Sequence, residues 1–341
     1  MAFLCYLPKK TAGDTNQTKR TILGVCSFLL VCLLIAGIKL YSLSDWTALD
    51  WKAVSVEQIK RFVRMGADVN YRNKEGITPL MLAASNRADS AVIEELIKAG
   101  AEVNVRRKDG VTPLMLAVSN GSSPAVVKAL IKAGAKVNTR DEKGFTPLIW
   151  AAKNTNSAVM AALIEAKANV NARNKDGVTP LIAAAQSNTN PDIIKMLANA
   201  KADVNASDES GETPLMAAAK SNENSAVITA LAEAGADIKV HDEDGKTLLM
   251  IAAKYNPVPE IIEALVKVGL GVNDRNMDGL TSLMIAAQNN TNPAVVEAIL
   301  KLGGKARLRD GFGKTALDYA AENLKMKESS AYWKLNDLKY E

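Results

Sequence analysis

The chain is poor in the residues that bind metals, form disulfides or carry out acid–base catalysis. Its 341 residues include a single histidine, His241, and three cysteines, all of which precede residue 39. Disulfides and Cys/His zinc sites are therefore excluded from the rest of the chain. His241 has no second histidine or cysteine with which to form a metal site or a catalytic triad, and no phosphate-binding glycine loop occurs. We therefore expect no enzyme activity, no cofactor, no metal and no small-molecule substrate.

The chain also has little net charge outside its N-terminus. The formal net charge at pH 7 is +5, but residues 1–41 contain five basic residues and only one acidic residue. The remainder carries 37 basic against 36 acidic side chains. Because a nucleic-acid-binding domain usually has a clear basic excess, we expect no nucleic-acid partner.

What the sequence does contain is a repeated motif. Thr-Pro-Leu or a close variant occurs eight times, with six spacings of 34 residues and one of 33. Equal spacing of this kind indicates a stack of similar units, each packed only on its neighbours. The motif threonines are Thr78, Thr112, Thr146, Thr179, Thr213, Thr247, Thr281 and Thr315.

Each unit has the signals of two short helices. In residues 104–137, a polar and glycine-containing turn precedes Thr112 and Pro113, which are typical of a helix N-cap and first helical position. Ser123 and Pro124 give the same signals for a second helix. That helix has apolar residues at helical spacing, namely Val126, Val127, Leu130 and Ile131.

These residues resemble the ankyrin repeats, whose signature is Thr-Pro-Leu-His-x-Ala on a turn and two antiparallel helices. Five copies of Thr-Pro-Leu match, beginning at Thr78, Thr112, Thr146, Thr179 and Thr213, as do endings such as Gly100-Ala101-Glu102-Val103-Asn104. The resemblance implies an all-α ankyrin-repeat solenoid that binds a protein partner. We assign it to residues 54–341, with a degenerate N-terminal cap, eight repeats and a closing cap at 315–341.

Two departures from the family pattern concern the interior and the repeat length. Methionine or isoleucine stands where the family has histidine, at Met81, Met115, Ile149, Ile182, Met216, Met250 and Met284, so we expect the polar network of that histidine to be absent. The 34-residue spacing exceeds the family's length by one residue. We expect the extra residue between the two helices, in asparagine-rich loops such as Ser187-Asn188-Thr189-Asn190.

The N-terminus has the pattern of a membrane anchor. Residues 21–38 form an uncharged apolar run, long enough at about 1.5 Å per residue to reach most of the way across a ~30 Å hydrocarbon core. We divide this region into a cytoplasmic segment 1–20, a transmembrane signal anchor 21–41 and a juxtamembrane linker 42–53. Three aromatic residues lie where an interfacial belt is expected, namely Tyr41, Trp46 and Trp51. A cleaved signal peptide is the alternative.

Positive charge before the run predicts the orientation. Lys9, Lys10, Lys19 and Arg20 precede it, whereas few basic residues follow it closely. We therefore expect a single-pass protein with a cytoplasmic N-terminus and the repeats on the extracytoplasmic, periplasmic side. An uncleaved anchor, loop asparagines and methionine in place of histidine suggest a bacterial source.

Two columns of residues are candidates for partner binding. The first is an apolar column immediately before the first four threonines, formed by Ile77, Val111, Phe145 and Val178. The column ends at the fifth repeat, where Glu212 stands in the same position, and Trp150 lies in the same repeat as Phe145. This column is either an exposed interface or packing within the turns. The arginine column six residues before threonine either binds an acidic partner or pairs with turn carboxylates, and its first members are Arg72, Arg106, Arg140 and Arg173.

The resulting hypothesis is a membrane-tethered scaffold that binds a protein through the concave and turn surfaces of its solenoid. One alternative is a secreted effector released by signal cleavage. Another is an anion-binding module that uses the arginine column. The ends of the first helices, among which Tyr255 is the one aromatic residue, are expected to be a solvated surface.

Overall fold

The computed structural model describes residues 46, 49–242 and 244–338, which form a row of helix pairs. A single helix, α2 (Val56–Arg64), precedes the pairs. The first helices of the pairs are α3 (Pro79–Ser85), α5 (Pro113–Ser119), α7 (Pro147–Ala151), α9 (Pro180–Ser187), α11 (Pro214–Ser221), α13 (Leu248–Tyr255), α15 (Ser282–Asn289) and α17 (Ala316–Glu322). The second helices are α4 (Ser90–Lys98), α6 (Pro124–Lys132), α8 (Ser157–Glu165), α10 (Pro191–Asn199), α12 (Ser225–Glu233), α14 (Pro259–Lys267), α16 (Pro293–Lys301) and α18 (Ser330–Asp337).

The repeated threonine is the N-cap of every first helix, as the sequence predicts. In each repeat its hydroxyl oxygen accepts a hydrogen bond from the backbone N–H three residues later, for example from Met115 to Thr112 at 3.3 Å. A cap of this kind contributes about 0.5–2 kcal/mol, and proline at the next position loses no needed donor. The same motif therefore restarts a helix eight times along the chain.

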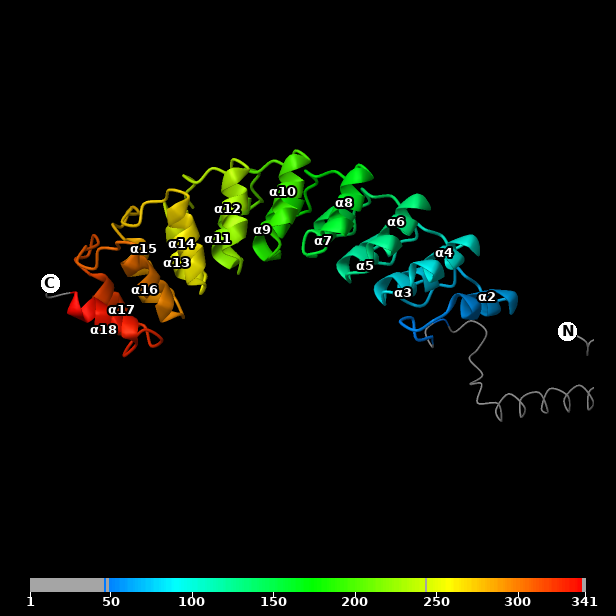
Figure 1. Cartoon of the computed structure of the whole chain (residues 1–341), viewed down its shortest axis with the longest axis horizontal. Helices are drawn as coiled ribbons and strands as arrows, with labels where there is room; N and C mark the ends of the chain where they lie inside the picture. The colour runs from blue at the N-terminus through cyan, green and yellow to red at the C-terminus, as the bar shows by residue number, and fades with distance from the viewer. Residues whose placement is uncertain (1–45, 47–48, 243, 339–341) are drawn as a thin grey trace, which may run out of the picture.

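The helix pairs form a curved solenoid (Figure 1). First helices pack against the first helices of the neighbouring repeats, and second helices do the same in a second row. In the helix pairs from α3–α4 to α11–α12, the first helices lie on the concave side of the arc. The residues that replace the family histidine are buried between the rows, with Met81 and Met115 at 0% exposure and Met284 at 1%. They belong to the packed core, as expected.

A column of buried asparagines connects consecutive repeats in the loop between the two helices. Asn256, for example, donates from Nδ2 to the backbone oxygens of Ala219 at 3.1 Å and Asn222 at 2.9 Å, and its Oδ1 accepts from the N–H of Val258 at 3.0 Å. The equivalent residues make the same pattern of bonds, and we call this set the asparagine ladder: Asn188, Asn222, Asn256, Asn290 and Asn323.

The ladder occupies the longer loops of the later repeats. In the 33-residue repeat, the second helix α8 begins at Ser157, and in the next repeat α10 begins at Pro191. The distance from the motif threonine to the second helix is one residue shorter for Thr146 and α8 than for Thr179 and α10. The length difference therefore lies between the two helices, where the sequence analysis places it. In the loops after α9, α11, α13 and α15, a ladder asparagine donates to two carbonyl oxygens of the preceding repeat, whereas the equally long loops after α3 and α5 hold no ladder asparagine. Because buried carbonyl groups left without donors are costly, the ladder asparagine is a structural element of the stack.

The N-terminal end of the described structure differs from the expectation. Trp46 and Trp51 are buried, at 0% and 4% exposure, and the Trp46 ring packs against Phe62 of α2 with centroids 5.3 Å apart. The prediction that these two rings form a membrane-interface belt is therefore wrong, because they cover the end of the solenoid core instead. The described part of the segment 42–53, which the sequence predicted to be a linker, therefore packs on α2.

The other end is closed by α17 and α18, within the segment expected to form the closing cap. Ala331 and Leu335 of α18 are buried against the core, whereas Trp333 is 52% exposed. None of the helices in the described residues has the length and apolar character needed to span a membrane. The expected span at 21–41 lies outside those residues, as does Tyr41.

Candidate binding surface

The four apolar residues before the motif threonines lie in the turns directly before the first helices, but they are not equally accessible. Ile77, Phe145 and Val178 are half-buried, whereas Val111 is 5% exposed. Val111 therefore packs within its turn, in line with the second of the two interpretations offered by the sequence. The other three present part of their side chains to solvent.

Phe145 and Trp150 form an aromatic pair on one repeat. Their ring centroids are 5.7 Å apart with a tilt of 47°, and both rings are half-buried. Trp150 Nε1 donates to Asp141 Oδ2 at 3.2 Å, while Asp141 Oδ1 accepts from the backbone N–H groups of Lys143 and Phe145. The turn thus fixes the orientation of the indole. An aromatic pair held in this way is a pre-organised apolar contact surface.

Two leucines that the sequence analysis did not single out extend this surface. Leu82 and Leu116 occupy the same position in α3 and α5 as Trp150 does in α7, and both are half-buried against the core. The signal that could have identified them is their place four residues after the motif threonine. We call Ile77, Leu82, Leu116, Phe145, Trp150 and Val178 the apolar stripe.

The arginine column is used mainly for contacts between repeats. Arg106, Arg140 and Arg173 each donate from the guanidinium to the backbone oxygen of the residue at the same position in the next repeat. Arg72 instead pairs with Glu102, with 2.9 Å between Nη2 and Oε2. The sequence suggested either an acidic partner or pairing with turn carboxylates for these arginines. Their bonds to main-chain oxygens were not predicted, and they occupy part of each guanidinium.

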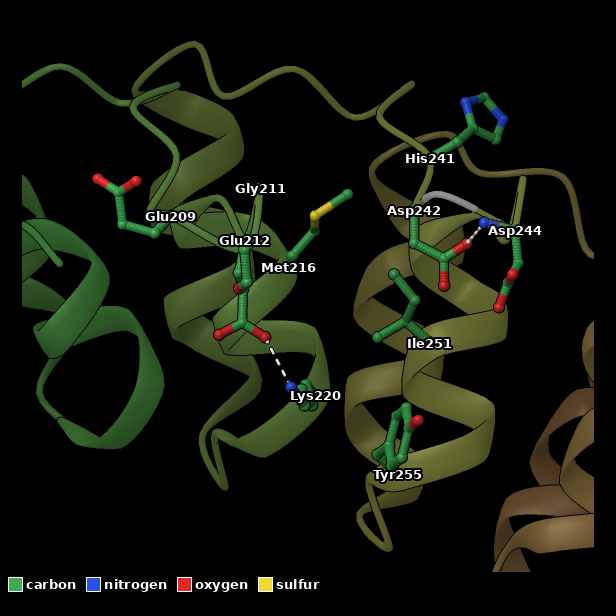
Figure 2. A pocket seen from close by; sticks show the side chains of 11 residues that line it. Glu209, Gly211, Glu212, Met216, Lys220, His241, Asp242, Asp244, Ile251 and Tyr255 are labelled. Atoms are coloured by element: carbon green, nitrogen blue, oxygen red, sulfur yellow. Dashed lines mark hydrogen bonds and ion pairs between the residues drawn. The ribbon is translucent and has the colours of Figure 1, made fainter. Parts of the chain in front are cut away.

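A pocket lies where the apolar stripe has ended, between the repeats that contain α11 and α13 (Figure 2). It has a volume of about 430 Å³ and is lined by the turn at Glu209–Glu212, by His241, Asp242 and Asp244, and by residues of the two helices. Met216 and Ile251 extend into the space between the helices, and Tyr255 lies at the end opposite the turns. Tyr255 is 51% exposed, so it is accessible as the sequence suggests, but it belongs to a concave site.

The charged groups of the pocket are partly paired. Lys220 Nζ lies 2.9 Å from Glu212 Oε1, and this hydrogen bond to Glu212 is the main cause that raises the pKa of Lys220. Lys246 lies beside both Asp242 and Asp244, and its hydrogen bond lowers the pKa of the Asp244 carboxyl. The lining residues themselves include four carboxylates and one lysine, so the turn end of the pocket is acidic.

The Tyr255 ring is also in contact with cations. Lys254 Nζ lies 4.7 Å and Lys220 Nζ 5.7 Å from the ring centroid, within the range of cation–π attraction. His241 is exposed at the rim of the pocket and forms a single antiparallel bridge with Thr247. The pocket therefore combines an aromatic ring, an aliphatic floor and an acidic end.

Comparison with known proteins agrees with the repeat architecture. The family described as "Ankyrin repeats (3 copies)" matches in overlapping segments at residues 49–141, 83–174, 122–208, 148–242, 185–276 and 249–330. A comparison with curated proteins finds no match. Among solved structures, the human ASB11 ankyrin repeat domain is similar, with a TM-score of 0.58 and 25% identity over 67% of this chain and 99% of that chain. The described fold and the matched segments together show that this chain belongs to the ankyrin-repeat family.

Proposed function

We propose that the protein is a membrane-tethered scaffold that binds a partner protein through the concave face of its solenoid. Ankyrin repeats are generally binding domains without enzymatic activity, and this chain belongs to that family. The observation that carries the proposal is the apolar stripe, whose oriented Phe145–Trp150 pair and two leucines lie on or beside first helices, the row on the concave side (Figure 1). Such surfaces typically mark protein interfaces.

The apolar stripe favours a protein partner over an anionic polymer. Aromatic and leucine side chains gain little from contact with a polyanion, whereas they bury well against apolar side chains of a protein. The arginines that could attract an anion donate to the main chain of the next repeat. Binding through the stripe should therefore change little between low salt and high salt, because it depends on apolar burial.

A crosslinking experiment tests the partner. We expect the full chain with a photoreactive benzoylphenylalanine in place of Trp150 to capture a protein from intact membranes, and Trp150→Ala to reduce capture at least tenfold in a pull-down. Gln288→Ala, at an exposed position of α15, is the matched control and should leave capture unchanged. Equal capture by both variants, or a tenfold loss between low and high salt, would contradict the proposal.

Tethering is the part of the proposal that the N-terminal sequence supports. The uncharged run 21–38 follows four basic residues, which is typical of a signal anchor with a cytoplasmic N-terminus. An alkaline phosphatase fused to the C-terminus should then be active in a bacterial host. N-terminal sequencing of the membrane-bound protein should show that the chain begins before the apolar run 21–38. Release of a shortened protein into the medium would instead support the secreted-effector alternative.

A further inference from the structure

The pocket between α11 and α13 has a chemistry that differs from the apolar stripe. Its floor is aliphatic at Met216 and Ile251, and Glu212 and Asp242 extend from the two neighbouring turns at one end, whereas Glu209 points away from the space between the helices (Figure 2). Tyr255, with its ring 51% exposed, marks the other end. A side chain that fills such a site needs a long apolar stem and a cationic head. Arginine has both.

We infer that this pocket binds an arginine side chain of the same partner that occupies the apolar stripe. The inference rests on the proposed function, since it assigns a second contact to the partner. The stem of the arginine lies along Met216 and Ile251, and its guanidinium donates to the carboxylates at the turn end. Charge complementarity carries this assignment, because the four carboxylates of the lining outnumber the two lysines that pair with them, Lys220 and Lys246.

The pairing within the pocket explains why arginine is favoured there. Lys246 contacts both Asp242 and Asp244, but each of these carboxylates has two oxygens, and Asp244 keeps 73% of its side chain exposed. The other oxygen of Asp244 can therefore accept a guanidinium N–H while Oδ2 keeps its lysine. Lys220 lies nearer the Tyr255 end of the pocket than Asp242 and Asp244 do (Figure 2), so a guanidinium at these aspartates is separated from this lysine.

The geometry of the stack sets the spacing within the partner. Two to three repeat steps separate α7, which carries Trp150, from the pocket. Stacked helices lie about 8–10 Å apart, which gives roughly 16–30 Å along the concave face. An extended segment covers this distance in roughly five to nine residues at about 3.3 Å each. The partner segment therefore carries an arginine at that distance from its apolar residues.

The pocket is tested directly with a small probe. In the full chain in detergent, 3-fluorotyrosine at position 255 reports binding by ¹⁹F NMR while N-acetylarginine amide is added. We expect a saturable shift with a Kd in the millimolar range, and at least tenfold weaker binding of the neutral isostere N-acetylcitrulline amide. Equal shifts for the two compounds, or no saturable shift, overturn the inference.

Matched variants locate the site. Asp244→Asn should weaken arginine binding at least threefold. Asp278→Asn, at the same place in the next repeat's turn, should have no effect. Both positions are exposed, so folding is expected to be unaffected and is checked by circular dichroism. Equal affinities for the two variants would also overturn the inference.

A peptide pair separates this inference from the proposed function. One peptide carries an apolar block and an arginine seven residues away, and the other has a two-residue spacer. The longer spacer should bind at least tenfold more tightly, because only it reaches both sites. If Trp150→Ala abolishes peptide binding while Asp244→Asn changes nothing, the scaffold proposal stands and the arginine site fails. If N-acetylarginine amide binds but the binding of neither peptide depends on Trp150, the arginine site stands and the scaffold proposal fails.

Discussion

At the scale of single residues, the asparagine ladder supplies the polar contacts of this solenoid. Asn256 is 1% exposed and satisfies three backbone groups at once, two in the preceding repeat and one in its own loop. The family histidine that normally anchors a polar network is methionine in the same repeat, Met250.

Asn256→Ala should therefore destabilise the repeats strongly. The substitution removes two donors and leaves the oxygens of Ala219 and Asn222 without them, which should cost about 2–4 kcal/mol. Urea denaturation followed by circular dichroism measures the fall in midpoint. Asn199→Ala, at an exposed helix end, is the control and should stay within about 0.5 kcal/mol. Equal midpoints for the two variants would show that the ladder is not important for stability.

Tyr319 gives a second prediction at this scale, based on pH. Burial and the hydrogen bond that its hydroxyl donates to Asp310 raise the pKa of Tyr319 to about 12, from an ordinary value of 10.0. The neutral form is thus favoured in the folded state, and its stabilising effect is complete below pH 10 and is lost as pH rises toward 12. Absorbance at 295 nm should show one late-titrating tyrosinate that Tyr319→Phe removes. A titration curve unchanged in that variant would refute the assignment.

At the scale of helices, the N-caps of the second helices show one exception. Asn190, Asn224 and Asn292 cap α10, α12 and α16, and each also donates to a backbone oxygen in the preceding repeat. The equivalent residue of α14 is Val258, which makes no side-chain cap bond. This helix therefore begins without the interaction that its neighbours share.

Val258→Asn should stabilise the protein. The new side chain can accept from the first turn of α14 and donate to the preceding repeat, so we expect a gain of about 1 kcal/mol after the loss of valine packing. The urea midpoint should rise for Val258→Asn and fall for Val258→Ala, which loses packing without adding a cap. A lower midpoint for both variants would mean that the apolar contact of Val258 outweighs the missing cap.

At the scale of the whole molecule, the contacts between repeats are not uniform. From α9 onward, each interface between repeats includes an asparagine that donates two buried or partly buried bonds. Between α5 and α7, the equivalent residue Asn154 donates one, to Val118, in the described structure. The same repeat has the shortest first helix, α7, with five residues. The interface between α5 and α7 thus has fewer such bonds than the later interfaces, whereas the repeats of α3 and α5 are joined by side-chain bonds of Arg87, Asn120 and Ser122.

Hydrogen exchange should reveal this difference. Because opening of a repeat array starts at its weaker interfaces, amides of α3 to α6 should exchange faster than those of α11 to α14. Mass spectrometry of the full chain in detergent measures the protection of each helix. Equal protection along the array would contradict the prediction and would indicate that the interfaces have similar strength. The apolar stripe begins in the less protected half, so its partner is expected to increase protection there.

The local rules of the sequence were sufficient to predict the repeats but not the role of every side chain. The motif threonine predicts a helix start from neighbouring residues alone, with proline after it in five of the eight copies, and all eight starts were confirmed. Trp46 was misassigned, because burial in the core depends on residues distant in sequence, such as Phe62. The Phe145–Trp150 contact was anticipated in part, since both residues belong to one repeat. The pocket at Tyr255 was not anticipated, because its walls come from two repeats.

The sequence by itself determined the architecture of this protein. A period of 34 residues and a cap at each unit are local properties, and stacking then follows because each unit must cover an apolar face. Only the tertiary structure decided which side chains are accessible. It buried Val111, engaged the arginines with neighbouring turns and opened a pocket between α11 and α13, since each of these depends on the position of one repeat relative to the next.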